Sequence, residues 1–380
     1  MIAVRHTFRY ASAAVATISV CLAIVIGSTM SSVAADTSPA IAIAGPNTAL
    51  ATPYAVAVDG SDIFVANNTG DSVTVYNISA SGNTDPIRAI SGDNPALAAP
   101  AGIAVLNSEV FVSTADNSIN VFNTADSGDV APKRKISGEL TRLSQPAGLT
   151  AIGSEIFVAN QSGWITVYNI SDSGDVPPKR VIEGSVTNLA FPTGVAVWGG
   201  DLFVANTLSP SVTVYNTGDS GDVAPKRTIS GANTGLTAPW GLAASGGELF
   251  VAEPMIASVS VFATGVSGNA TPVRTISGPG TELNNPNALA VSGSQLIIAN
   301  SGNQGEQETA VNPDHVTNSG AGSIYGSITI HQNPGLAGAG TAAHKSANGP
   351  ELSPASPTTP ITPATPGNSR ERERAQARSW

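Results

Sequence analysis

The stretch that decides the fold is Ile63-Phe64-Val65-Ala66-Asn67, an apolar run that ends in an asparagine. Close copies of it recur along the chain, and their second residues are spaced 47, 46, 46, 47 and 47 positions apart. These second residues are Phe64, Phe111, Phe157, Phe203, Phe250 and Ile297. A period this regular is the signature of a repeat architecture in which each repeat is one structural unit.

Each repeat contains three further segments with the composition of β-strands. One follows a proline and consists of small residues, as in Pro100 to Val105. Another has the pattern of Ser72 to Asn77, and the last follows a second proline, as in Pro86 to Gly92. Four strands at this spacing form one blade of a β-propeller. Residues 36–333 are therefore predicted to form an all-β, six-bladed propeller of four-stranded blades.

The two ends of the array predict how the ring closes. The last repeat has a third strand at Ser327 to Ile330 but no fourth. A segment before the first repeat, Ser38 to Gly45, matches the fourth strand of the fifth repeat, Thr271 to Gly278. Pairing this N-terminal strand with the last blade would close the ring and leave no open gap. Removal of residues 36–46 is expected to destabilise the whole ring.

Residues 1–35 have the layout of a secretory signal peptide, with positive residues, then an apolar run from Ala11 to Gly27, then small residues. The alternative is an uncleaved anchor, because the run is nearly long enough to span a membrane. Lipidation of Cys21, the only cysteine, is disfavoured by the valine before it. We expect cleavage after Ala35 and a secreted, periplasmic or cell-wall-associated protein, with membrane contact only through an uncleaved leader.

Residues 334–380 consist mainly of Gly, Ala, Thr, Ser and Pro and end in a charged run. They hold too little apolar material for a packed core, so a disordered tail is predicted. Its role is open between a wall-spanning or glycosylated tether and no role at all.

Charge argues against a nucleic-acid partner. Residues 36–333 contain 10 basic and 24 acidic residues, a net charge of −14, whereas a phosphate-binding surface needs a basic patch. Nine of the ten basic residues fall in the predicted outer strands. The Asp-Ser-Gly-Asp loops before these strands, at 126–129, 172–175 and 219–222, are interpreted as turns paired with the outer basic residues rather than as Ca²⁺ sites.

Catalytic motifs are sparse. The sequence has no Gly-x-Ser-x-Gly elbow, His-Glu-x-x-His pair or phosphate-binding Gly loop. His331 takes the place of the Tyr or Phe that ends the third strand elsewhere, which predicts a packed or rim histidine. The composition therefore gives poor support to nucleophilic and metallohydrolase chemistry.

One candidate site is the set of residues that end the second strands, which the propeller fold would place around the axis. The set is Asn67, Asn160, Asn206, Glu253 and Asn300, with Ala115 in the second repeat. Four amides and a carboxylate could bind a ligand or coordinate Ca²⁺ or Mg²⁺ through oxygen atoms, with Glu253, Asn160 and Asn206 as the metal candidates. The alternative, which we favour, is that each asparagine only starts a turn. No cofactor is otherwise expected.

A second candidate is the insertion at 301–326 in the last repeat. It is about twenty residues longer than its counterparts and contains Glu306, Glu308, Asp314 and His315. Loops of this length are functional or disordered. We favour a mobile loop, and a lid over the tunnel mouth that includes His315 is the alternative.

The repeat unit Pro100-Ala101-Gly102-Ile103-Ala104-Val105, with Val110-Phe111-Val112 and Asn117 to Phe122, resembles NHL repeats from about residue 38 to 333. This resemblance implies a six-bladed propeller of the broad class that includes NHL proteins and gluconolactonase-like enzymes. NHL repeats usually carry Asp after the Val-Ala pair, whereas this chain has Asn67 there. Streptogramin lyases use a catalytic histidine, and none here occupies a repeat position.

Two functions follow as expectations. The preferred one is an exported, monomeric and non-enzymatic scaffold that binds a protein, a glycan or another cell-envelope component through its loop face. The alternative is a metal-dependent lactonase or lyase that uses the axial ring.

Overall fold

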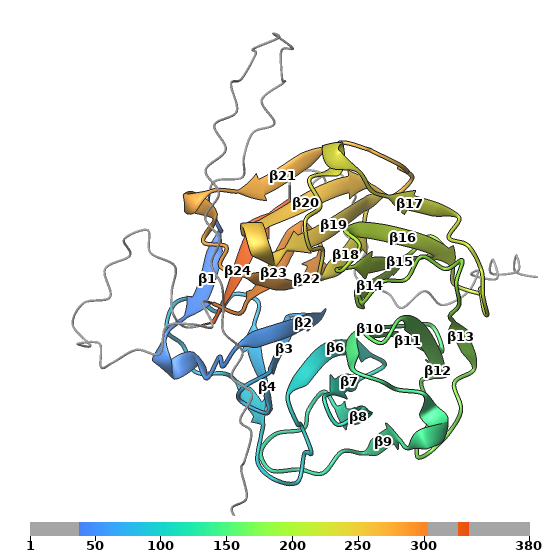
Figure 1. Cartoon of the computed structure of the whole chain (residues 1–380). Helices are drawn as coiled ribbons and strands as arrows, with labels where there is room; N and C mark the ends of the chain where they lie inside the picture. The colour runs from blue at the N-terminus through green and yellow to red at the C-terminus, as the bar shows by residue number, and fades with distance from the viewer. Residues whose placement is uncertain (1–37, 303–325, 334–380) are drawn as a thin grey trace, which may run out of the picture.

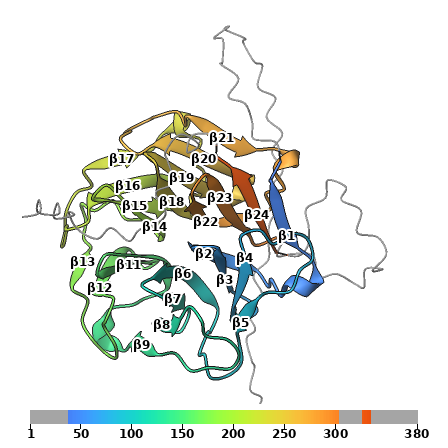
Figure 2. The same ribbon diagram turned by 180° about the vertical axis from the view of Figure 1, so that it is seen from behind.

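The computed structural model describes residues 38–302 and 326–333, and these form six four-stranded antiparallel sheets arranged in a ring. Figure 1 shows the ring from one face, and Figure 2 shows the same ring from behind. The predicted all-β, six-bladed propeller is confirmed. The predicted leader (1–35), most of the insertion (303–325), with His315, and the predicted tail (334–380) lie outside the described residues.

The blades share one layout of inner, second, third and outer strands. The inner strands are β2 (Pro53–Asp59), β6 (Pro100–Leu106), β10 (Pro146–Ile152), β14 (Pro192–Trp198), β18 (Leu242–Ser245) and β22 (Pro286–Ser292). The second strands are β3 (Asp62–Asn67), β7 (Glu109–Thr114), β11 (Glu155–Asn160), β15 (Asp201–Asn206), β19 (Glu248–Glu253) and β23 (Gln295–Asn300). The third strands are β4 (Ser72–Asn77), β8 (Ser118–Asn123), β12 (Trp164–Asn169), β16 (Ser211–Asn216), β20 (Ser258–Ala263) and β24 (Ser327–Gln332).

The outer strands are β5 (Arg88–Ile90), β9 (Arg134–Ser137), β13 (Arg180–Ile182), β17 (Arg227–Ile229), β21 (Arg274–Ser277) and β1 (Ile41–Ala44). Single 3₁₀ turns follow several of them: η1 (Pro46–Thr48), η2 (Glu139–Thr141), η3 (Ala232–Thr234) and η5 (Pro279–Thr281), while η4 (Pro254–Ile256) follows β19. Of the helical turns in the described part of the chain, none has the length and apolar character needed to cross a membrane.

The N-terminal strand closes the ring, as predicted. β1 pairs antiparallel with β24, so that Ile43 lies opposite Ile328, and the sixth sheet runs β1-β24-β23-β22. Ile43 is fully buried. The closing strand therefore supplies both ladder hydrogen bonds and core area to the last blade.

The hydrophobic core lies between neighbouring blades. The second and third strands are buried on both faces, which explains their continuous apolar runs. One core cluster, for example, joins Phe64, Val75 and Ile90 of the first blade to Val112 and Phe122 of the second. Each blade therefore completes the core of its neighbour, and a single blade has no core of its own.

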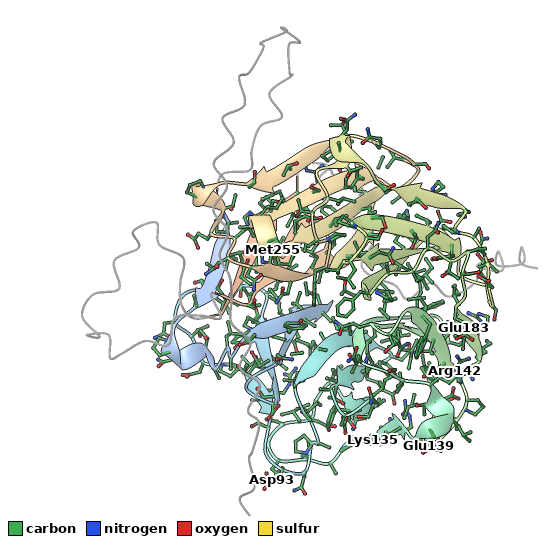
Figure 3. All side chains as sticks on the ribbon, in the orientation of Figure 1. Asp93, Lys135, Glu139, Arg142, Glu183 and Met255 are labelled. Carbon is green, nitrogen blue, oxygen red and sulfur yellow. The ribbon has the colours of Figure 1, made fainter. Side chains whose placement is uncertain are left out.

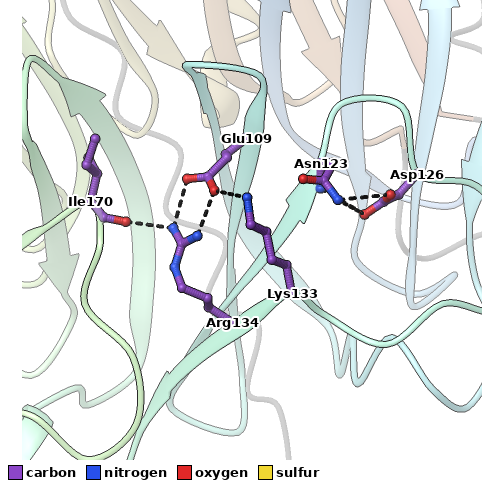
Figure 4. A network of polar contacts seen from close by, with 6 residues as sticks. All are labelled: Glu109, Asn123, Asp126, Lys133, Arg134 and Ile170. Atoms are coloured by element: carbon purple, nitrogen blue, oxygen red, sulfur yellow. Dashed lines mark hydrogen bonds and ion pairs between the residues drawn. The ribbon is translucent and has the colours of Figure 1, made fainter.

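In the first five blades, ion pairs on the rim link the outer strand to the start of the second strand. Arg134 of β9 donates two hydrogen bonds to the Glu109 carboxylate, at 2.6 and 2.8 Å, and one to the Ile170 carbonyl of the third blade, at 2.7 Å (Figure 4). Lys133 donates to the same carboxylate at 2.7 Å. The loop aspartate Asp126 instead accepts hydrogen bonds from its own turn. The predicted pairing of the loop aspartates with the outer arginines is therefore wrong.

Candidate functional site

The ring axis is narrow because glycines let the inner strands approach one another closely. A Cβ atom on Gly194 would lie 2.1 Å from the Trp240 carbonyl oxygen, and one on Gly241 would lie 2.3 Å from that of Asn287. Real Cβ atoms do not tolerate such contacts. The axial cavity that remains between the inner strands has a volume of only about 60 Å³. A ligand larger than a few waters therefore has to bind at an end of the axis rather than inside it.

A larger cavity of about 330 Å³ opens at the end of the axis where the second strands finish. We call it the tunnel mouth. Its lining residues are Thr52, Tyr54, Asn68, Thr207, Ala238, Trp240, Pro254, Met255, Asn285, Asn287 and Ser301. Figure 3 shows Met255 near the centre of the ring on this face. The volume is within the range of small-molecule binding sites.

The tunnel mouth is asymmetric because the residue after the inner-strand proline differs from blade to blade. In blade order these residues are Tyr54, Ala101, Ala147, Thr193, Trp240 and Asn287. The Tyr54 and Trp240 rings meet edge to face, with their centroids 5.9 Å apart and their planes at 89°. Burial raises the pKa of Tyr54 to about 12, so its phenol stays neutral at physiological pH. The large side chains therefore concentrate on one side of the mouth.

Amides and hydroxyls complete the lining. Asn68 Nδ2 donates to the Pro100 carbonyl at 3.3 Å, and Thr207 Oγ1 donates to the Pro239 carbonyl at 2.8 Å. Asn287 lines both the mouth and the axial cavity. Because backbone carbonyls orient two of these side chains, the polar part of the mouth is largely formed in advance of any ligand.

The predicted ring of asparagines does not line this cavity. Asn67, Asn160, Asn206 and Asn300 are fully buried. Each Nδ2 donates to a threonine hydroxyl of the third strand in its own blade, at 3.0 to 3.1 Å. Each Oδ1 accepts a backbone N–H from the segment that leads into the inner strand, at 2.9 to 3.2 Å. The side chains thus bind within their blades, and the structure does not bring them together.

The strand register also changes which residue of the second blade belongs to the predicted ring. In the second blade the position equivalent to Asn67 is Thr114, not Ala115, because Thr114 pairs with Ser118 as Asn67 pairs with Ser72. In four other blades the residue that follows the predicted position does reach the tunnel mouth: Asn68, Thr207, Pro254 and Ser301. In these blades the predicted positions therefore lie one residue before the side chains that line the tunnel mouth.

Glu253 takes the asparagine position in the fifth blade and binds differently. Its Oε2 accepts the Thr237 N–H at 2.9 Å, the Thr237 hydroxyl at 2.8 Å and the Ala238 N–H at 2.9 Å. Its Oε1 is buried without a hydrogen-bond partner among the described residues. The described residues contain no group of three or more His, Cys, Asp or Glu side chains placed to hold a metal ion.

Three exposed apolar side chains stand in the loops that follow two neighbouring second strands. Leu208 lies after β15, and Met255 and Ile256 lie after β19; their exposed fractions are 76%, 79% and 50%. Because these loops also contribute Thr207 and Pro254 to the tunnel mouth, the apolar side chains adjoin it. They add apolar surface on the side of Trp240.

Sequence reasoning missed Tyr54, Trp240 and Asn287. The sequence does contain a signal for them. They follow a proline that recurs in every repeat, and the residue at their position is small in some repeats and aromatic or an amide in others. Variation at one position of an otherwise constant repeat marks the side chains that the scaffold does not need. His331, in contrast, is buried as predicted, with 1% of its surface exposed.

The sequence matches no family model and no curated protein.

Proposed function

We propose that the protein is an exported, non-enzymatic binding scaffold that recognises a glycan of the cell envelope at the tunnel mouth. One observation carries this proposal: the rings of Tyr54 and Trp240 meet at the mouth, with their centroids 5.9 Å apart, beside a set of amide side chains. The propeller supplies the rigid scaffold, and the variable residues supply the site.

The chemistry of the lining suits a neutral polar ligand with apolar faces. Sugar rings present C–H groups that pack on aromatic rings and hydroxyls that hydrogen-bond to amides. Asn68, Asn285 and Asn287 offer both donors and acceptors for such hydroxyls. At about 330 Å³ the cavity is near the lower end for ligand sites, which favours a terminal sugar over a long chain.

Titration calorimetry with soluble oligosaccharides released from cell envelopes tests the proposal. Trp240→Ala should weaken binding at least tenfold, because it removes the largest stacking surface. The matched control is Trp198→Ala, which removes a half-exposed tryptophan at the other end of β14, away from the mouth. Equal affinities for wild type and Trp240→Ala, or equal losses in both variants, would contradict a site at the mouth.

The second candidate function is that of a metal-dependent lactonase or lyase. The observation that favours it is the buried Oε1 of Glu253, which has no hydrogen-bond partner among the described residues. A cation held by Glu253 with Asn160 and Asn206 would require the two asparagines to leave their present partners. Calorimetry with Ca²⁺ and Mg²⁺ on the wild type and on Glu253→Gln separates the two functions. Cation binding to the wild type that is lost in the variant would support the enzyme function. No cation binding to the wild type would contradict it.

Export is tested by fractionation. The mature protein should be recovered outside the cytoplasm with an N-terminus at Asp36. Recovery of the full-length chain in the membrane fraction would instead support an uncleaved anchor.

A further inference from the structure

The loops between the second and third strands differ in character around the ring. In the first three blades they consist of polar and small residues: 68–71 reads Asn-Thr-Gly-Asp, 115–117 reads Ala-Asp-Asn and 161–163 reads Gln-Ser-Gly. In the fourth blade the loop 207–210 reads Thr-Leu-Ser-Pro, and in the fifth the loop 254–257 reads Pro-Met-Ile-Ala. The first three loops are ordinary turn chemistry, whereas a turn has no need of the leucine, methionine and isoleucine in the last two.

These three residues, Leu208, Met255 and Ile256, form what we call the apolar patch. Among the large apolar side chains that are exposed in the described part of the chain, Met255 and Leu208 have the largest exposed fractions. Single exposed apolar residues are normal on a protein surface. A group of them in two neighbouring loops instead indicates a surface that a ligand or partner covers.

The apolar patch is continuous with the tunnel mouth. Met255 belongs to both, since it also lines the cavity, and Figure 3 labels it on this face. Thr207 and Pro254 line the cavity too, and Thr207 precedes Leu208 in the chain. Thr207 Oγ1 donates to the Pro239 carbonyl at 2.8 Å, which holds the loop of the fourth blade against the fifth. A ligand that extends out of the mouth over these loops therefore meets apolar side chains.

The turn that carries Met255 and Ile256 is fixed by its own backbone. Pro254 begins the single 3₁₀ turn η4, and the Ala257 N–H closes it on the Pro254 carbonyl at 3.2 Å. Ala257 has φ +47°, in the left-handed region that ends the turn. The backbone thus presents both apolar side chains at the surface before any ligand binds, which lowers the cost of ordering them on binding.

We propose that the ligand of the tunnel mouth is a neutral glycolipid, with its sugar in the mouth and its alkyl or acyl chain on the apolar patch. This inference rests on the proposed glycan site and specifies what the glycan carries. Because the cavity of about 330 Å³ holds little more than a terminal sugar, the rest of the ligand lies outside it. The described residues that line the mouth include no charged side chain, so a charged headgroup would find no counter-ion among them.

The size of the patch favours a single lipid chain over a protein partner. Each side of a stable protein interface contributes about 20–30 residues, whereas the patch consists of three side chains from two short loops. An alkyl chain needs only a narrow apolar strip. Met255 suits it, because the flexible and polarisable methionine side chain adapts to ligands of different shape.

Titration calorimetry of the full chain with paired glycosides tests the proposal. The probes are methyl and octyl β-glucoside and methyl and octyl β-N-acetylglucosaminide, each octyl compound below its micelle concentration. Each methylene that leaves water is worth about fourfold in affinity, so contact of two or more with the patch should make an octyl glycoside bind at least about tenfold more tightly than its methyl partner. Octanol, which carries the chain without the sugar, should bind more weakly than either octyl glycoside.

Substitutions outside the cavity lining locate the lipid chain. The double variant Leu208→Ser/Ile256→Ser should lower the octyl-to-methyl affinity ratio to about threefold or less, because it removes two of the three apolar side chains. The methyl glycosides, which do not reach the patch, should bind to it as they bind to the wild type. The matched control is Ile87→Ser, at an exposed apolar residue beside the outer strand β5, and it should keep the wild-type ratio. Equal melting temperatures show that both variants are folded.

The outcomes separate this proposal from the glycan site on which it rests. Equal affinities within each pair, or an unchanged ratio in the double variant, would overturn the lipid chain. If the envelope oligosaccharides bind and neither octyl glycoside does, the lipid chain is wrong and the glycan site stands. If no oligosaccharide and no glycoside binds, both are wrong.

Two other occupants of the patch have their own signatures. Octanol that binds as tightly as the octyl glycosides would show a site for an apolar chain alone, without a sugar, and would overturn the proposal. Dimers in analytical ultracentrifugation that Leu208→Ser converts to monomers would assign the patch to a second copy of the chain, with the same consequence.

Discussion

Asp175 Oδ1 accepts the backbone N–H of Leu140 at 2.7 Å, and this bond ties the outer loop of the third blade to the linker that leads into it. The linker begins at Gly138, whose φ is +128°, and the Asp175 side chain fills the space where a Cβ would lie. The neighbouring Gly174 bridges Ile136 of the second blade. Two successive loop residues thus hold adjacent blades together at the rim.

Asp175→Ala should lower the free energy of unfolding by about 1 kcal/mol, because it leaves the linker N–H without its acceptor. Asp175→Asn should stay close to the wild type, since Asn83 and Asn269 make the same bond in other blades. Urea denaturation measures both values. Equal losses for the two variants would show that charge, not the hydrogen bond, matters at this position.

The closing strand can be tested with one side chain. Ile43→Ala should lower the free energy of unfolding by about 2–5 kcal/mol, because Ile43 is fully buried where the first and last blades meet. Ile87→Ala, at a residue with 53% of its surface exposed, is the control and should change it little. The unfolding transition should remain single and cooperative. A wild-type value for Ile43→Ala would contradict closure through β1.

The fold was predictable because the same pattern of strand-forming residues recurs at a regular spacing in every repeat. The spacing of Phe64 and its counterparts set the blade number, and the match of the segment around Ile43 to an outer strand set the closure. The rim contacts were not predictable in the same way. Asp175 acts on Leu140, 35 residues earlier, and a local reading of Asp-Ser-Gly-Asp could only suggest a turn.

The sequence indicated the end of the ring at which the tunnel mouth lies, but it did not indicate the side chains that line this cavity. Asn67 was singled out because it recurs, yet it recurs because its amide bonds to Thr74 and to the Ala51 N–H inside the blade. Tyr54 and Trp240 escaped notice because they do not recur. In a repeat protein, recurring residues are the ones that the scaffold needs, so the residues that vary are those free to form a site.

The glycines of the inner strands give a further prediction. Gly194→Ala would place a Cβ 2.1 Å from the Trp240 carbonyl oxygen, so the strands must separate, at a cost of about 1–3 kcal/mol. The same shift should move Trp240 and weaken the glycan binding that we propose for the mouth. Gly218→Ala is the matched control, because no atom lies within 4 Å of its Cβ position. Thermal unfolding and ligand titration of both variants measure the two effects.

The rim carboxylates predict how stability responds to acid. Two hydrogen bonds of 2.7 Å from Arg180 hold the pKa of Glu155 down at about 2, against an ordinary value of 4.5. A carboxylate whose pKa is lower in the folded state stabilises the protein above the ordinary pKa, and that contribution is lost as the pH falls towards the folded-state pKa. The Glu155 contribution should therefore be complete above pH 4.5 and disappear between pH 4.5 and 2.

Glu155→Gln isolates this contribution. The variant should melt at a lower temperature than the wild type at pH 6, and its melting temperature should fall less between pH 4.5 and 2, because one titrating group is gone. The double variant Glu155→Gln/Arg180→Gln should show the same shallow dependence, since the ion pair is already broken in the single variant. Calorimetric scans across this pH range measure the slopes. A wild-type slope in Glu155→Gln would mean that other carboxylates, such as Glu109 beside Arg134, carry the acid response instead.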